Sequence, residues 1–176
     1  GKEDPEAALL SRYDLSSLRR LYLAGERLDP ATYQWLKEKT SLPVIDHWWQ
    51  TETGWAIAST PLTEGYQTKS GSAGLPVAGY DIQILDENSQ QMPANQQGCV
   101  AIKLPLPPGC LATIWQNPER FTAGYLSTHE GYYVTGDGGY IDDDGYLFIM
   151  GRTDDVINVA GHRLSTGEME EILSAN

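Results

Sequence analysis

The stretch that decides the fold is Val134–Arg163, which reads VTGDGGYIDDDGYLFIMGRTDDVINVAGHR. Short apolar runs alternate in it with glycines and aspartates, and Asp144-Gly145 is a strong signal for the turn of a β-hairpin. A second polar loop, beginning at Gly151, follows the expected hairpin directly. Polar residues next to tight glycine turns predict a ligand-binding site formed by both backbone and side-chain groups.

The first part of the chain predicts an α/β layer. Asp-Pro pairs at residues 4–5 and 29–30 are helix-start signals, so we expect a short helix over 6–13 and a longer one ending near residue 39. Apolar runs at 18–24 and 43–46 flank the longer helix and predict strands. This strand–helix–strand order is characteristic of parallel strands, and ligands bind beyond the carboxyl ends of such strands.

From about residue 70 the chain is expected to be rich in antiparallel β-structure, because glycine and proline become frequent and apolar residues alternate. Asn117–Tyr125 carries proline at its second position and predicts one short helix. A last helix is expected to begin at the capping box Ser165–Glu168. The expected strands are 80–85, 99–104, 111–115, the two arms of a hairpin within 132–150, and 155–160.

Composition narrows the class of protein. The chain has 176 residues, of which 40% are hydrophobic and 20% charged, so we expect a soluble globular protein. Its net charge of -12 argues against binding nucleic acid or a membrane through a basic surface. Cys99 and Cys110 fit no zinc or redox spacing, and no apolar run is long enough for a membrane helix.

Four stretches together resemble the adenylate-forming (AMP-binding) superfamily and, more narrowly, its short-chain acyl-CoA synthetases. In chain order they are AGERLDP (Ala24–Pro30), DHWWQTETGW (Asp46–Trp55), VTGDGGYIDDDGY (Val134–Tyr146) and GRTDDVINVAGHR (Gly151–Arg163). The DHWW run and KLPLPPG at Lys103–Gly109 are most similar to propionyl-CoA synthetases. The resemblance implies ATP-dependent conversion of propionate to propionyl-AMP, followed by thioester formation with coenzyme A.

The resemblance also implies an α+β fold. It consists of the C-terminal part of an α/β layer, a small antiparallel β-barrel-like subdomain, and the first strand and helix of a C-terminal domain. The expected boundaries are 1–69, 70–150, a hinge at 151–155, and 156–176. The glycine-rich phosphate loop and the catalytic lysine of the family do not occur in the sequence. We therefore expect an internal fragment of a longer enzyme, with no catalytic residue of its own and inactive alone.

Several residues take nucleotide-binding roles from this resemblance. Asp137, expected in a tight turn directly after Gly136, would accept hydrogen bonds from the ribose hydroxyls. Trp48 would offer a flat face to adenine. Glu52 would hold Mg²⁺, which prefers a carboxylate together with phosphate oxygens and water. The full nucleotide-binding set is Gly25, Glu26, Trp48, Gln50, Thr51, Asp137, Arg152 and Arg163.

Other residues take roles around the acyl group and coenzyme A. Ala24 stands where acetate-specific relatives have valine, which leaves room for about one more carbon, and Trp49 would limit the length of the acid. Asp154 would be the hinge, and Ala160 and Gly161 would lie beside the pantetheine arm.

The implied ligands are ATP or AMP, Mg²⁺, coenzyme A and a short carboxylate, with no nucleic acid or membrane partner, in the cytoplasm. Two alternatives stay open. One is an acetyl-CoA synthetase or another short-chain acyl-CoA ligase. The other, from a different class, is a non-catalytic ligand-binding module rich in Trp and Tyr, since the chain has 5 Trp and 10 Tyr.

Overall fold

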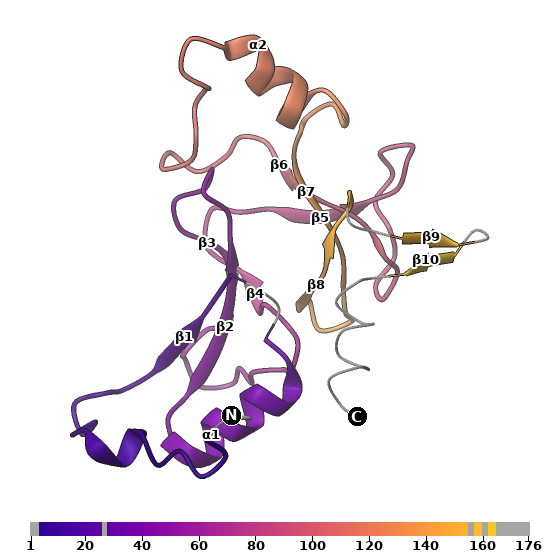
Figure 1. Ribbon diagram of the computed structural model, residues 1–176. Coiled ribbons are helices and arrows are strands. Elements are labelled where there is room, and N and C mark those ends of the chain that lie inside the picture. Colours follow the sequence, from indigo (N-terminus) through magenta and orange to yellow (C-terminus); the bar gives the residue numbers. More distant parts are fainter. Residues whose placement is uncertain (1–3, 26–27, 155–156, 160–161, 165–176) are drawn as a thin grey trace.

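The computed structural model describes residues 4–25, 28–154, 157–159 and 162–164, with only the backbone described for the last two ranges. These residues form two four-stranded sheets and one two-stranded hairpin (Figure 1). A helix lies at each end of the pair of large sheets, α1 at one end and α2 at the other (Figure 1). No helix among these residues has the length and apolar character needed to span a membrane.

The first sheet has the strand order β1-β2-β3-β4. β1 pairs with β2 in parallel, as predicted, whereas β3 and β4 join in antiparallel orientation, so the sheet is mixed. The helix α1 (Pro30–Thr40) connects the parallel pair, and its N-cap Asp29 accepts a hydrogen bond from the backbone of Thr32, which confirms the predicted helix start. The strands are β1 (Leu21–Leu23), β2 (Val44–Trp49), β3 (Ala56–Ser59) and β4 (Leu75–Pro76).

The second sheet is antiparallel throughout, in the order β5-β6-β7-β8. Its last two strands form the predicted hairpin, and the predicted short helix is α2 (Pro118–Phe121), which continues as a π-helix, η2 (Thr122–Leu126). The strands are β5 (Ile82–Leu85), β6 (Gly98–Lys103), β7 (Tyr132–Ile141) and β8 (Leu147–Arg152). The small hairpin consists of β9 (Ile157–Val159) and β10 (His162–Leu164), and the predicted final helix lies outside the described residues.

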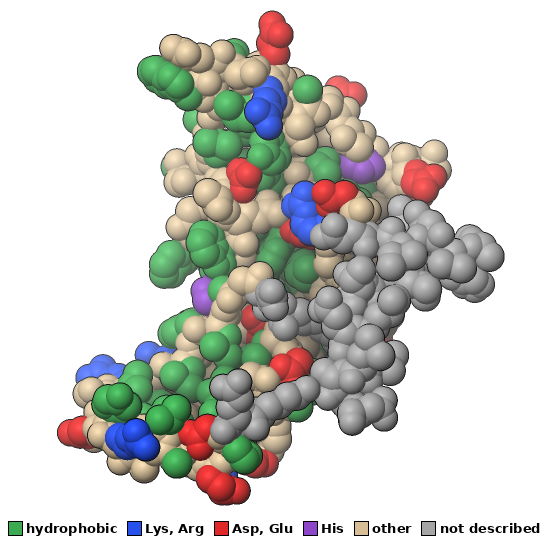
Figure 2. Space-filling model, in the orientation of Figure 1, with side chains coloured by type: hydrophobic (Ala, Val, Ile, Leu, Met, Phe, Trp, Pro, Cys, Tyr) green, Lys and Arg blue, Asp and Glu red, His purple; other side chains and the backbone are tan. Residues whose placement is uncertain are grey.

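One hydrophobic core joins the two large sheets. It takes Ile57 from β3, Ile84 from β5, Val100 from β6 and Leu147 from β8, all nearly or wholly buried. An isolated β-bridge between Gly74 and Leu147 ties the end of the first sheet to the second. Hydrophobic side chains also reach the surface in both halves of the face drawn in Figure 2. The sheets therefore share an interior while keeping part of their apolar surface exposed.

Two predicted elements are wrong. The helix over 6–13 is a series of turns ending in a short 3₁₀-helix, η1 (Leu10–Arg12), because Ala7 adopts a φ of 56° and breaks the helical path. The strand over 111–115 is absent from the described sheets. Its first amide, that of Leu111, donates instead to the carbonyl of Glu52 at 2.6 Å, and Trp115 is 86% exposed. In this segment the hydrogen bond to Glu52, in a turn far away in the sequence, overrides the local preference for a β-strand.

Candidate functional site

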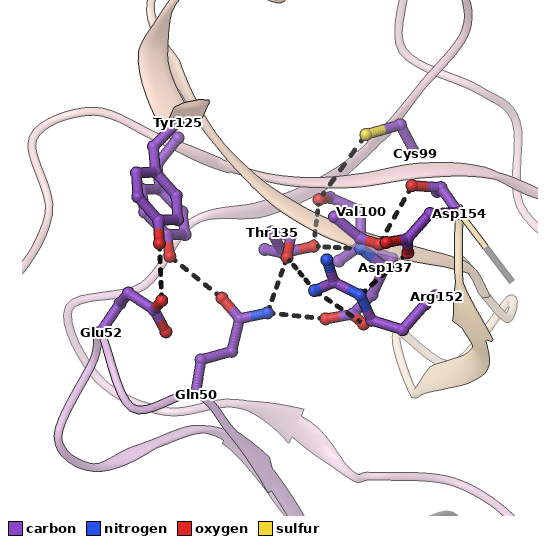
Figure 3. Close-up of polar contacts among 12 residues, drawn as sticks. Gln50, Glu52, Cys99, Val100, Tyr125, Thr135, Asp137, Arg152 and Asp154 are labelled. Carbon is purple, nitrogen blue, oxygen red and sulfur yellow. Dashed lines mark hydrogen bonds and ion pairs between the residues drawn. The ribbon is translucent and has the colours of Figure 1, made fainter. Parts of the chain in front are cut away.

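A tight turn between β2 and β3 carries several of the predicted site residues. Thr53, which is buried, organises this turn. Its hydroxyl donates toward the backbone carbonyls of Gln50 and Trp55 and accepts from the backbone N–H of Gln50 at 3.1 Å. A threonine hydroxyl can satisfy both roles because it is at once donor and acceptor. The turn therefore presents the side chains of Gln50 and Glu52 to the second sheet in a fixed position (Figure 3).

The amide of Gln50 bridges from this turn to β7. Its Nε2 donates to the carbonyl of Thr135 and to Oδ2 of Asp137, both at 2.8 Å. Its Oε1 accepts from the hydroxyl of Tyr133 at 3.0 Å. One side chain thus makes three polar contacts with alternate residues of a single strand, and it binds the two sheets together where Asp137 lies.

Asp137 and Arg152 are paired across β7 and β8. Arg152 Nη1 lies 4.0 Å from Asp137 Oδ1 and donates to the carbonyl of Thr135 at 3.2 Å, while its Nε donates to Asp154 at 3.1 Å. Gly136 makes room for the guanidinium: a Cβ at this position would lie 2.8 Å from Arg152 Nη2. The expectation that Asp137 sits in a tight turn is wrong, since Gly136 and Asp137 lie within the long strand β7.

Burial sets the charge state of Asp137. The residue is only 6% exposed, and this burial raises its pKa to about 6. Arg152 and the hydrogen bonds from Gln50 and Trp48 act in the opposite direction, and the negative charge of Asp154 adds slightly to the rise. The carboxylate is therefore ionised at neutral pH but close enough to titration for a small change in its partners to matter.

Glu52 lies beside an aromatic stack. Tyr125 donates its hydroxyl to Glu52 Oε1 at 2.7 Å, and its ring stacks on that of Tyr133 with centroids 5.3 Å apart. No group of three or more metal-ligating side chains occurs among the residues that the structure describes. A single half-buried carboxylate fits Mg²⁺ only where phosphate oxygens and water complete the coordination, which is the usual way in which proteins bind this ion with a nucleotide.

The remaining predicted residues of the first sheet lie at the same end of β1 and β2. Trp48 is half-buried and packs against the core. Trp49 is 45% exposed at the end of β2, and Ala24 is exposed just after β1. Gly25 follows with a φ of 107° and open space on its Cβ side, and Thr51 is exposed in the turn.

Four predicted residues lie partly or wholly outside the described part of the chain. Glu26, Ala160 and Gly161 are outside it, and Arg163 is described only as a backbone position on β10. Their assigned roles stay predictions. Asp154 is described and pairs with Arg152, so the structure joins the predicted hinge residue to the predicted nucleotide-binding arginine.

Three residues that shape the candidate site were missed by sequence reasoning: Thr53, Tyr125 and Tyr133. Thr53 lies inside the quoted TETG run, and a hydroxyl residue in a glycine-containing turn is a local signal for a capping role. The two tyrosines carry no such signal, because their partners Gln50 and Glu52 are far away in the sequence. Only the packing of η2 and β7 against the β2–β3 turn reveals them.

Comparison with known proteins gives a consistent result. Residues 2–107 match the family model described as AMP-binding enzyme. The chain is 47% identical to the mouse acyl-CoA synthetase short-chain family member 3, mitochondrial, over 97% of its own length and 25% of that protein. It is also 47% identical to a propionate–CoA ligase of Salmonella typhimurium, over 96% of its own length and 27% of the ligase. The chain therefore spans about a quarter of the length of these curated relatives.

A solved structure is similar over the same extent. The crystal structure of the anthranilate CoA ligase AuaEII, in complex with anthranoyl-AMP, superposes with a TM-score of 0.80 at 31% sequence identity. The match covers 96% of this chain and 31% of that one. The comparison of sequences and the comparison of structures thus both find CoA ligases or acyl-CoA synthetases.

Proposed function

This chain belongs to the AMP-binding enzyme family, and we propose that it is part of a propionate–CoA ligase that works through an acyl adenylate. A carboxylate is a poor acyl donor. In the proposed first step a carboxylate oxygen attacks the α-phosphorus of ATP, the bond to the bridging oxygen breaks, and pyrophosphate leaves. In the second, the thiol of coenzyme A loses its proton and its sulfur attacks the acyl carbon, so that a thioester forms and AMP leaves.

The observation that carries the proposal is the arrangement of Gln50, Asp137 and Arg152. A buried carboxylate, held by an amide and flanked by a half-exposed guanidinium, is suited to a vicinal diol, because two carboxylate oxygens can accept from two hydroxyls. The ribose of an adenine nucleotide carries such a diol. We therefore assign Asp137 and Arg152 to the ribose, with Gln50 holding the carboxylate in place.

The neighbouring residues complete half of a nucleotide site in this proposal. Trp48 and Gly25 border the adenine, and the Thr51 hydroxyl reaches a phosphate oxygen. Negative charge develops at the α-phosphate during the first step, so donors and cations converge there. Glu52 is the carboxylate that would hold Mg²⁺, which would neutralise phosphate charge.

The acyl pocket, the hinge and the site for coenzyme A are the finer parts of the proposal. Ala24 and Trp49 lie at the same end of two adjacent parallel strands, where both can border a short acyl chain. Asp154 serves as the hinge, and its bond to Arg152 lets hinge motion reach the ribose. Coenzyme A is assigned to Ala160 and Gly161, and the nucleotide phosphate to Arg163. The location is proposed to be the cytoplasm. An acetate-specific ligase is the nearest alternative.

The acyl-pocket assignment is tested by the substitution Ala24→Val. The full gene product containing these residues is assayed for acyl-CoA formation from acetate, propionate and butyrate with ATP and coenzyme A. We expect propionate to be preferred and Ala24→Val to lower the kcat/KM ratio of propionate to acetate about tenfold, since one methylene is worth roughly 1–3 kcal/mol. The change Ala123→Val on the exposed surface of η2 is the matched control. An unchanged ratio would refute the role of Ala24.

A further inference from the structure

We propose that Tyr133 is a positioning residue of the nucleotide site: its buried hydroxyl fixes the orientation of the Gln50 amide and, through it, the carboxylate of Asp137. This inference rests on the proposed function, because it concerns the residue that we assign to the ribose. It adds a group that does not touch the nucleotide.

The Tyr133 hydroxyl can act only as a donor in this contact. It lies 3.0 Å from Gln50 Oε1, an amide oxygen that has no proton to give. Tyr133 is wholly buried, and this burial raises the pKa of its phenol above the ordinary value, so the proton stays on the ring oxygen. The hydroxyl therefore holds the oxygen end of the Gln50 amide in place.

The other end of the amide faces two acceptors. Nε2 donates to the carbonyl of Thr135 and to Asp137 Oδ2, both at 2.8 Å. If the amide rotated by half a turn, its oxygen would face a carbonyl and a carboxylate, and its NH₂ group would face the phenol. Removing the phenolic hydroxyl deletes the printed hydrogen bond that anchors the oxygen end among the described residues. The amide is then held only through its NH₂ group and can move away from Asp137.

The direction of the hydroxyl is itself constrained. The Tyr133 ring stacks on Tyr125 with an interplanar angle of 5°, and Tyr125 is held by its bond to Glu52. The phenylalanine ring of a Tyr133→Phe variant would keep this stack and lose only the hydroxyl. The variant is therefore a narrow probe of the bond to Gln50.

The expected consequence is a change in the pH dependence of nucleotide binding. Among the described residues, the charged groups that face Asp137 are Arg152, at the end of β8, and Asp154, in the residues after it. The side-chain hydrogen bonds come from Trp48 on β2 and from Gln50 in the turn that follows it. Loss of an oriented Gln50 removes a donor that lowers the pKa of Asp137, which burial has already raised to about 6. Ionisation of Asp137, and with it ribose binding, should then require a higher pH.

The experiment is AMP binding by calorimetry between pH 6 and 8.5, using the full gene product and its Tyr133→Phe variant. We expect the acid limb to move up by about one pH unit, so that affinity falls about fivefold at pH 6 and recovers to within about twofold at pH 8.5. Protonation of AMP itself cancels, since every protein receives the same ligand.

Tyr132→Phe is the matched control, because Tyr132 donates to Gln83 Oε1 at 2.8 Å in the same kind of bond, directed at β5 instead of the site. It should leave the pH profile unchanged. Gln50→Leu provides a second route should Tyr133→Phe not fold: it should shift the acid limb in the same direction. Adding Tyr133→Phe to it should cause no further shift.

An equal loss of affinity at every pH, or a profile like that of Tyr132→Phe, would overturn the positioning role and leave the proposed function standing. So would an unshifted acid limb in Gln50→Leu. Two results would overturn both the proposed function and this inference. One is a wild-type protein that binds no AMP at any pH. The other is an Asp137→Ala variant that binds AMP with the same affinity as the wild-type protein.

Discussion

Asp137 is the residue at which stability and the proposed function oppose each other. Its carboxylate is buried, so its pKa rises to about 6 from the ordinary 3.8. Between these two values the folded protein binds more protons than the unfolded chain, and stability falls as pH rises through this window. Above pH 6 the folded state keeps a charge that its surroundings disfavour. Such a cost is expected where a charged group is held ready for a ligand.

The substitution Asp137→Asn should therefore stabilise the protein while weakening nucleotide binding. At pH 7.5 we expect a free energy of unfolding higher by about 1–3 kcal/mol, and the gain should disappear as pH falls to 4, where the wild-type carboxyl becomes neutral. Urea denaturation at several pH values measures this, with the exposed Asp143→Asn as control. A less stable Asp137→Asn protein at pH 7.5 would show that ionised Asp137 contributes net stability.

Sequence reasoning identified Asp137 and Arg152 because each follows a glycine in a motif that can be read locally. It could not identify Tyr133, whose partner Gln50 lies in the turn between two strands of the other sheet. Nor could it show that Trp48, assigned to adenine, also supplies a hydrogen bond to Asp137. Contacts between distant segments depend on how the sheets meet, and no local pattern encodes that.

Among the secondary-structure elements, the β7–β8 hairpin carries Asp137 and Arg152 of the site. Ion pairs made by Lys69 stabilise the turn of this hairpin. Lys69 pairs with Asp142 at 2.5 Å and Asp144 at 2.6 Å and lies 4.5 Å from the centre of the Tyr146 ring. These contacts tie the loop before β4 to the turn opposite the site. The hairpin was predictable because its turn residues and alternation agree. The helix over 6–13 was not, because a single left-handed residue, Ala7, interrupts it.

The junction between the sheets gives a test of packing at one glycine. A Cβ on Gly74 would lie 2.2 Å from the backbone of Ser59 and Thr60, so Gly74→Ala should destabilise the protein by more than about 2 kcal/mol. Gly65→Ala is the control, since Gly65 has nearly the same φ, 94° against 93°, but no atom within 4 Å of its Cβ position. Equal losses in thermal or urea unfolding would mean that φ strain, and not the close approach of the Ser59 and Thr60 backbone, dominates.

In the molecule as a whole, the site arises because one core joins the two large sheets. The β2–β3 turn meets β7 and β8 at Gln50, Asp137 and Arg152, so each sheet contributes part of the constellation (Figure 3). The sequence predicted both halves, a layer with a parallel pair and an antiparallel β-region. It could not predict the β-bridge between Gly74 and Leu147 that aligns them, because this bridge pairs backbone groups and leaves no residue pattern.

The most direct measurement is ATP–pyrophosphate exchange by the full gene product, with and without propionate. We predict exchange that depends on propionate and falls about 100-fold in Asp137→Ala, since the loss of hydrogen bonds to a charged group is worth about 3 kcal/mol. Exposed Asp143→Ala should retain it. A folded protein that binds AMP through Asp137 but catalyses no exchange with propionate, acetate or butyrate would contradict the assignment of this site to acyl adenylation.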